Sequence, residues 1–141
     1  MADRIVVVMA PTFDAIGLAA ADMATTLAFY RRLGLDIPAE ADTESHVEAI
    51  LPGGIRLMWD SNEMLASLDP DFTPPTGAGA SLAFLCADAT EVDSVHAEMV
   101  QAGHVSHREP WDAVWGQRYA VLKDPDGNTV DLFAWVKTPQ A

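Results

Sequence analysis

The chain has 141 residues, half of them hydrophobic, and a formal net charge of −13 at neutral pH. A chain of this length can bury a core of its own, so we expect one compact domain, residues 1–141, that folds without a stabilising disulfide or metal. The acidic balance disfavours nucleic acid and anionic membrane as partners, because both are bound through clustered Lys and Arg.

The N-terminal apolar run, Ile5 to Met9, is too short for a membrane span or for the core of a secretory signal. We therefore expect a cytoplasmic protein, and we interpret this run as an extra edge strand. The single cysteine, Cys86, lies within an apolar run and is expected to be a buried, unreactive thiol.

Two segments of the chain repeat one pattern. In the first, a small-residue strand at 16–20 precedes Asp22 as a helix N-cap, and Gly34 ends the helix. The same signals recur around Asp88, after a strand at 82–86. The two N-caps are 88 − 22 = 66 residues apart and the strands before them align at the same offset, which indicates an internal duplication.

Each helix is followed by strand-like segments, so each half is predicted to be a βαβββ module. The alternation of apolar and polar residues predicts strands at His46 to Leu51, Ile55 to Trp59, Gln117 to Leu122 and Thr129 to Trp135. This predicts an α+β fold of two modules, about 13–60 and 81–136, forming an open, curved mixed sheet with a concave cup. The connector, 61–80, is long for a loop, so we expect a short helix near 62–68.

The paired modules, the stretch LAFYRRLGL (27–35) and the stretch DPDGNTVDLF (124–133) resemble the vicinal oxygen chelate superfamily. That group includes glyoxalase I, extradiol dioxygenases and bleomycin-resistance proteins. The resemblance covers about 13–136 and implies a glyoxalase-like fold, usually a homodimer, with a small-molecule ligand. It does not imply one activity, because the superfamily hosts several.

Metal-binding members of this superfamily carry His, Gln or Glu at four equivalent strand positions. The resemblance places these positions at Ala15, Leu57, Ser81 and Asp131. Alanine and leucine have no donor atom and serine is a poor neutral ligand, whereas a divalent ion needs about three good protein donors. We therefore expect no metal and no cofactor, and we interpret Asp131 as a pocket wall residue ahead of a general base or a metal ligand.

The histidines are not expected to build a metal site elsewhere. His96 lies on the apolar stripe of the second helix, and His104 and His107 point to opposite faces of a strand. His46, at the start of an inner strand, is the one histidine that we keep as a candidate pocket residue.

Strand alternation predicts which side chains line the cup. If Asp131 faces the cup, Phe133 and Trp135 share its face, and the module alignment places Leu57 and Trp59 on the matching face. The segment Glu109 to Tyr119 adds two tryptophans that either roof the cup or pack into a dimer interface or the core. The candidate ligand-binding residues are Leu57, Trp59, Trp111, Trp115, Gln117, Tyr119, Asp131 and Phe133.

These features favour a metal-free homodimer of the bleomycin-resistance kind that sequesters an aromatic or cationic small molecule. The alternative is a metal-dependent lyase, isomerase or dioxygenase of the same superfamily, completed by ligands from substrate, water or a second subunit. In that case Asp131 is a base or an anchor, assisted by His46 or Tyr119. A third interpretation is that the dimer surface is the function and the cup is vestigial.

Overall fold

The computed structural model describes residues 11–77 and 79–136. Its elements in chain order are β1 (Ala15–Ala20), α1 (Met23–Arg32), the 3-10 helix η1 (Ala39–Thr43), β2 (His46–Ile50), β3 (Arg56–Ser61), α2 (Asn62–Leu68), β4 (Ser81–Leu85), α3 (Ala89–Gln101), β5 (Val105–Ala113), β6 (Gln117–Lys123) and β7 (Thr129–Trp135). The strand expected at 5–9 lies outside the described residues.

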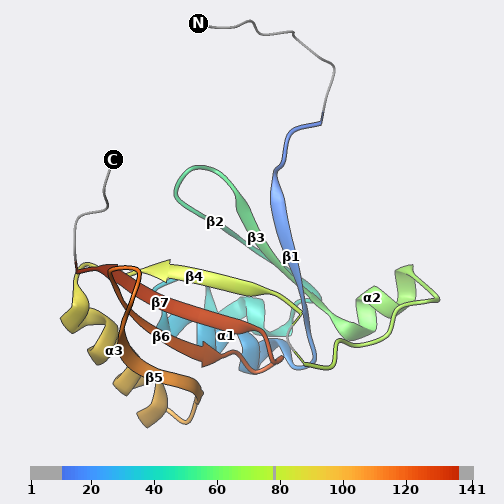
Figure 1. Ribbon diagram of the computed structural model, residues 1–141. Coiled ribbons are helices and arrows are strands. Elements are labelled where there is room, and N and C mark those ends of the chain that lie inside the picture. The colour runs from blue at the N-terminus through green and yellow to red at the C-terminus, as the bar shows by residue number, and fades with distance from the viewer. Residues whose placement is uncertain (1–10, 78, 137–141) are drawn as a thin grey trace, which may run out of the picture.

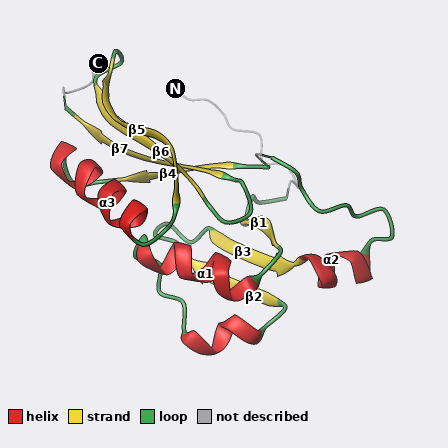
Figure 2. Cartoon of the chain, turned by 90° about the horizontal axis from the view of Figure 1, so that it is seen from below, coloured by secondary structure: helices red, strands yellow, loops and turns green. Residues whose placement is uncertain are grey.

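The strands form two mixed sheets with the same topology. The first has the order β1-β3-β2 and the second the order β4-β7-β6-β5. In the first sheet β1 pairs in parallel with β3, and in the second β4 pairs in parallel with β7. The first sheet stands at a steep angle to the second (Figure 1), and α1 and α3 lie on one side of the molecule, in front of the strands in Figure 2. The predicted α+β fold and the duplication are confirmed.

The first module has two strands after its helix, where βαβββ predicts three. Within the described ranges, η1 occupies the place that β5 holds in the second module. The N-cap of η1 is Pro38, and the segment carries the acidic residues Glu40 and Asp42 in its first turn. Proline cannot donate to a strand ladder and acidic residues are depleted in strands, so this segment does not extend the sheet.

The helix boundaries follow the predicted capping signals. Asp22 accepts a hydrogen bond from the Thr25 amide at 3.1 Å, and Asp88 accepts one from the Glu91 amide at 2.8 Å. The Glu91 side chain in turn accepts the amide of Ala87, one residue before the N-cap, at 2.8 Å, which is a variant of the capping box on α3. The short helix expected in the connector is α2, Asn62–Leu68.

The strand residues that face α1 and α3 form the core. On β7, Val130, Leu132 and Ala134 are buried, while Asp131 and Phe133 on the opposite face are partly exposed, as alternation predicts. Cys86 is also buried, and burial raises the pKa of its thiol.

The orientation predicted for Leu57 and Trp59 is wrong. Both are buried in the core, and the Trp59 ring centroid lies 5.2 Å from that of Tyr30 on α1. Strand pairing explains the error, because Gly17 pairs with Met58 whereas its duplicate 66 residues on, Ala83, pairs with Asp131. The first-module counterpart of Asp131 is therefore Met58, one residue after the position that the sequence alignment gave.

The turn between β6 and β7 fixes the second module against α1. Buried Asp124 accepts hydrogen bonds from the Tyr30 hydroxyl at 2.6 Å and from the Asn128 amide group at 2.8 Å. Asp126 accepts the Ala21 amide at 2.8 Å, at the start of the same helix. A turn of one module thus holds the helix of the other.

Candidate functional site

The open side of the second sheet carries aromatic and charged residues in two rows. Strand pairing aligns Asp131 with Val121 and Arg108 in one row, and Phe133 with Tyr119 and Trp111 in the next. The side chains of these rows on β6 and β7 project away from the helices, because their strand neighbours on the other face are buried in the core. We call the group Trp111, Trp115, Tyr119, Asp131 and Phe133 the aromatic face.

Tyr119 is the centre of the aromatic face. Its ring centroid lies 6.2 Å from Phe133 in a stacked arrangement, and 5.4 Å from Trp111 and 5.5 Å from Trp115 in edge arrangements. Its hydroxyl donates to Asp131. Burial, together with Asp131, raises the pKa of the Tyr119 hydroxyl to about 12, so the hydroxyl stays protonated and keeps donating at neutral pH.

A cation already lies on this surface. The guanidinium of Arg108 sits 3.5 Å from the centroid of the Trp111 ring. Arg108 is placed there by an irregularity in the β5–β6 pairing, where the register shifts on either side of it. The Trp111 ring therefore offers a face that accepts a flat, delocalised cation.

Trp115 lies at the rim of the aromatic face. Its side chain is half exposed, and its Nε1 donates to Gln117 Oε1 at 2.7 Å. Gln117 itself is buried, so it supports Trp115 and has little surface left for a ligand. Trp135 and Val114 are exposed nearby, and such a group of exposed apolar residues is typical of a binding or subunit surface.

The first sheet carries a charged network on the face opposite its core. His46 on β2 contacts Asp60 Oδ1 through Nδ1 at 2.5 Å and Glu48 Oε2 through Nε2 at 2.6 Å. Arg56 contacts the same Glu48 oxygen at 2.8 Å and Asp14 Oδ2 at 2.7 Å. The hydrogen bonds with Glu48 and Asp60 raise the pKa of His46. Of this network, the sequence singled out His46 alone.

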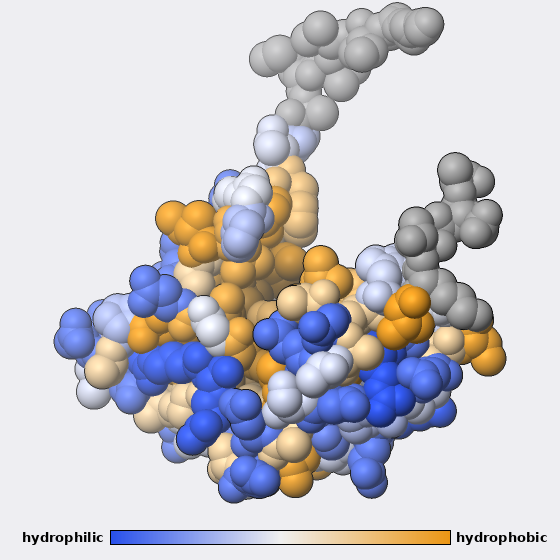
Figure 3. All heavy atoms as spheres, turned by 90° about the vertical axis from the view of Figure 1, so that its left-hand side faces the viewer, coloured by the Kyte–Doolittle hydropathy of each residue, from blue (hydrophilic) through white to orange (hydrophobic). Residues whose placement is uncertain are grey.

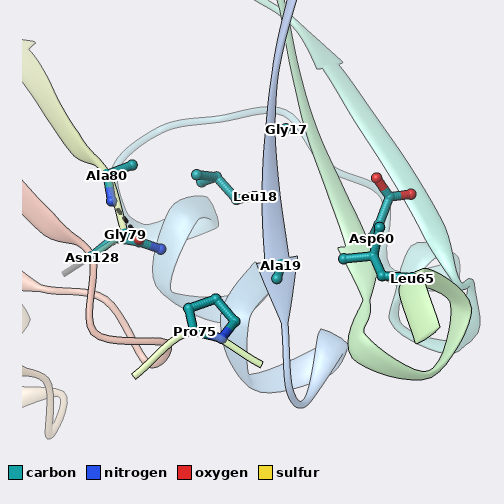
Figure 4. A pocket seen from close by; sticks show the side chains of 9 residues that line it. All are labelled: Gly17, Leu18, Ala19, Asp60, Leu65, Pro75, Gly79, Ala80 and Asn128. Atoms are coloured by element: carbon teal, nitrogen blue, oxygen red, sulfur yellow. Dashed lines mark hydrogen bonds between the residues drawn. The ribbon is translucent and has the colours of Figure 1, made fainter. Parts of the chain in front are cut away.

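Two hollows lie where the modules meet. One, of about 350 Å³, is lined by residues of β1, β3, α2, the connector and the β6–β7 turn (Figure 4): Gly17, Leu18, Ala19, Asp60, Leu65, Pro75, Gly79, Ala80 and Asn128. The other, of about 770 Å³, is mostly apolar and runs between β1 and β4, with Ile16, Leu51, Leu57 and Phe84 among its lining residues. Figure 3 looks onto a hydrophobic hollow on this side of the molecule.

The comparisons with known proteins agree with this geometry. The family model described as Glyoxalase/Bleomycin resistance protein/Dioxygenase superfamily matches residues 12–132. The chain belongs to this superfamily. No curated protein matches the chain by sequence.

Solved structures of the glyoxalase superfamily share the fold at low identity. A glyoxalase/bleomycin resistance protein/dioxygenase from Nocardioides is 21% identical with a TM-score of 0.74, covering 96% of this chain and 90% of its own. A family enzyme from Burkholderia phytofirmans is 17% identical with a TM-score of 0.75, covering 89% and 99%. A lactoylglutathione lyase from Agrobacterium tumefaciens is 20% identical with a TM-score of 0.64, covering 89% and 95%. At these identities the likeness shows the fold alone.

The metal positions of the superfamily do not fit a divalent ion in this chain. With the corrected strand register they are Ala15, Met58, Ser81 and Asp131, and Asp131 already accepts a hydrogen bond from Tyr119. One carboxylate and one hydroxyl fall short of the donors that Zn²⁺ or Mg²⁺ requires. Throughout residues 11–77 and 79–136, no three His, Cys, Asp or Glu side chains are grouped as metal ligands.

Two other histidines have packing roles. His96 is buried and its Nε2 lies 2.7 Å from Ser106 Oγ, while the His104 ring packs edge-on against Phe29 at 5.0 Å.

None of the helices in the described part of the chain is long and apolar enough to cross a membrane.

Proposed function

We propose that this member of the glyoxalase superfamily is a metal-independent cytoplasmic binding protein that sequesters an aromatic, cationic small molecule on the aromatic face. The observation that carries the proposal is the position of Asp131, a carboxylate held by Tyr119 beside stacked and edge-packed rings. A flat ligand would lie on the rings, and its positive charge would be balanced by Asp131.

The energies of such contacts are large enough for useful affinity. Each aromatic contact contributes about 0.5–1.5 kcal/mol beyond burial, and a desolvated cation over a tryptophan about 2 kcal/mol. The 3.5 Å contact of Arg108 with Trp111 is an intramolecular example of the same interaction. The net charge of −13 also favours the approach of cations over anions.

We further propose that the protein acts as a homodimer. The apolar hollow between β1 and β4 has the exposed side chain of Leu85, at 67% exposure, among its lining residues. An apolar hollow with an exposed apolar rim is typical of a subunit contact. Sedimentation equilibrium tests this part of the proposal, which a monomer at all concentrations would contradict.

Phenylalkyl compounds of one size and different charge test the ligand class. We would titrate phenethylammonium, 2-phenylethanol and 3-phenylpropionate and follow tryptophan fluorescence, because these compounds do not absorb where tryptophan is excited. We expect saturable changes with affinity falling from cation to alcohol to anion. Asp131→Asn should weaken binding of the cation by about tenfold, since an ion pair with a partly buried carboxylate is lost.

Asp112→Asn is the matched control. It removes the same charge from an exposed side chain of β5 whose contact is Arg118, outside the aromatic face. It should leave the affinity unchanged. If none of the three compounds saturates, or if the two variants behave alike, the proposal is wrong.

The alternative, a metal-dependent lyase, isomerase or dioxygenase of the superfamily, is tested by elemental analysis of the purified, dialysed protein. The donor set argues against it, and we expect well below one equivalent of Ni, Zn, Mn or Fe per chain. A stoichiometric ion that is lost in Asp131→Asn would replace our proposal with an enzyme that uses this carboxylate as a ligand.

A further inference from the structure

The smaller hollow at the module junction is a second candidate ligand site, and none of its lining residues belongs to the aromatic face. The β1 residues Gly17 and Ala19 form one wall, between Asp60 with Leu65 on one side and Ala80 with its neighbours on the other (Figure 4). A Cβ placed on Gly17 would meet only the Met58 side-chain methyl, at 3.7 Å, so this wall is open to a ligand. The volume of about 350 Å³ suits a small organic molecule.

Asp60 is the one ionisable side chain among the residues that line this hollow. Its side chain is 15% exposed, and His46 contacts its Oδ1 atom, which leaves Oδ2 for a ligand. The other polar side chain, Asn128, is already engaged, because its Oδ1 accepts the Ala80 amide at 3.0 Å and its Nδ2 donates to Asp124. The hollow is therefore apolar with a single anionic group.

The contacts of His46 define its charge in this arrangement. Both ring nitrogens lie within hydrogen-bond distance of a carboxylate oxygen, at 2.5 and 2.6 Å. A neutral imidazole can donate from one nitrogen only, so both contacts are favourable only when the ring is doubly protonated. The imidazolium therefore acts as a resident counter-ion of Asp60.

The surrounding charges are mostly negative. Glu48 on β2, Asp60 on β3 and Asp14 before β1 are offset by Arg56 and by protonated His46. A neighbouring surface hollow adds the acidic side chains Asp42, Glu44 and Glu63, of which Asp42 is paired with Arg31 at 2.8 Å. When His46 loses its proton, one of its two contacts is lost and this surface becomes more negative by one charge.

From this geometry we propose that the junction cavity binds a small organic ammonium compound with an apolar body, with Asp60 as its counter-ion and His46 as the competing internal cation. The site is separate from the aromatic face, and it does not depend on the function proposed above. Its affinity for a cation should rise with pH, because deprotonation of His46 removes the competing charge.

Cyclohexylammonium is the probe, and cyclohexanol is its neutral counterpart of similar shape. We would record backbone amide NMR spectra at about pH 6 and about pH 8.5, and follow the His46 ring protons in the same samples to show how far the ring has lost its proton. We expect the amides of Gly17, Ala19 and Ala80 to shift with cyclohexylammonium, with about tenfold tighter binding at the higher pH. Cyclohexanol should bind more weakly and without pH dependence.

Three variants complete the test. Asp60→Asn should abolish the preference for the ammonium compound, and His46→Gln should give the high-pH affinity at both pH values. Glu98→Gln removes an exposed acidic side chain of α3 and should leave the affinity for cyclohexylammonium unchanged at both pH values. The same spectra report whether each variant is folded.

The proposal fails if the cavity amides do not shift, if cyclohexanol and cyclohexylammonium bind equally, or if Asp60→Asn binds like the wild type. Asp131→Asn separates the two sites, because it should weaken binding on the aromatic face and leave cyclohexylammonium unaffected. Loss of the cyclohexylammonium shifts in Asp131→Asn would show that the ammonium binds the aromatic face and would overturn the proposal of a second site.

Discussion

Replacing Tyr30 by Phe tests how the turn between β6 and β7 holds the two modules together. Tyr30 is fully buried, and its hydroxyl donates to Asp124 Oδ2 at 2.6 Å, where Asp124 is itself only 4% exposed. Burial, followed by the negative charge of Asp124, raises the pKa of this hydroxyl far above its ordinary value. The group is therefore a permanent donor to a buried carboxylate.

The expected loss of stability in Tyr30→Phe follows from the contacts that remain. Phenylalanine keeps the ring packing against Phe29, at 5.0 Å, and against Trp59, at 5.2 Å, so the substitution creates no large cavity. Asp124 keeps its contacts with the Asn128 side chain and two backbone amides. Loss of one hydrogen bond to a charged group should lower the free energy of unfolding by about 1.5–3 kcal/mol. For a chain of this size the Tm should fall by about 5–10 °C.

Urea unfolding followed by circular dichroism measures the change, at one fixed protein concentration because subunit association would shift the midpoint. Tyr119→Phe is the matched control, since it also removes a hydroxyl that donates to a carboxylate, but at a partly exposed position. It should cost less than about 1 kcal/mol. A cost below about 0.5 kcal/mol for Tyr30→Phe, or an equal cost for the two variants, would refute the argument from burial.

Three further results are expected. Gly127→Ala should lower the free energy of unfolding by about 1–3 kcal/mol in urea, because φ is +90° there and a Cβ would lie 3.2 Å from a connector carbonyl oxygen; wild-type stability would contradict this. The pKa of His46, followed in NMR through its ring protons, should lie above the ordinary histidine value and should fall toward that value in Glu48→Gln. Because the folded-state pKa is raised, the ion pairs of His46 stabilise the fold fully at acid pH, and this stabilisation is lost as the pH rises through the raised pKa. Arg108→Ala should strengthen phenethylammonium binding severalfold, since it frees the Trp111 ring and removes a positive charge, and weaker binding would show that Arg108 does not compete.

The sequence was most informative where structure is set by local signals. The N-caps Asp22 and Asp88 and the C-terminal glycines Gly34 and Gly103, with φ of 99° and 96°, all lie where the sequence placed them. Each of these signals acts over one helical turn, so it can be detected without knowing what packs against the helix. Their repetition at a constant offset was sufficient to predict the duplication.

The faces of β3 could not be assigned from the sequence in the same way. Alternation has a period of two, so an alignment error of one residue exchanges the core face and the open face of a strand. The module alignment contained such an error, which put Leu57 and Trp59 on the open face in place of Met58. The register of the β2–β3 hairpin gives the correct face, because Ala49 pairs with Leu57 and the two side chains are buried together in the core.

The cluster around His46 was missed for a related reason. His46 and Asp60 are 14 residues apart and meet only because β2 and β3 pair in a register that sets them directly opposite each other. Glu48 then lies on the same face as His46, two residues along β2. With the correct hairpin register, the sequence would have predicted the three residues together.

The duplicated fold explains why Asp131 and Asp60 do not come together in one cluster. The strand registers make Met58 equivalent to Asp131 and Asp60 equivalent to Phe133, so the position equivalent to each carboxylate carries an uncharged residue in the other module. A metal site of the superfamily draws donors from equivalent positions of both modules, and here one module is always without one. Each carboxylate is instead held by a neighbouring strand of its own sheet, Asp131 by Tyr119 and Asp60 by His46. Such an arrangement offers two single negative charges in different surroundings, one among aromatic rings and one beside a titratable imidazole, and single charges of this kind suit organic cations better than metal ions.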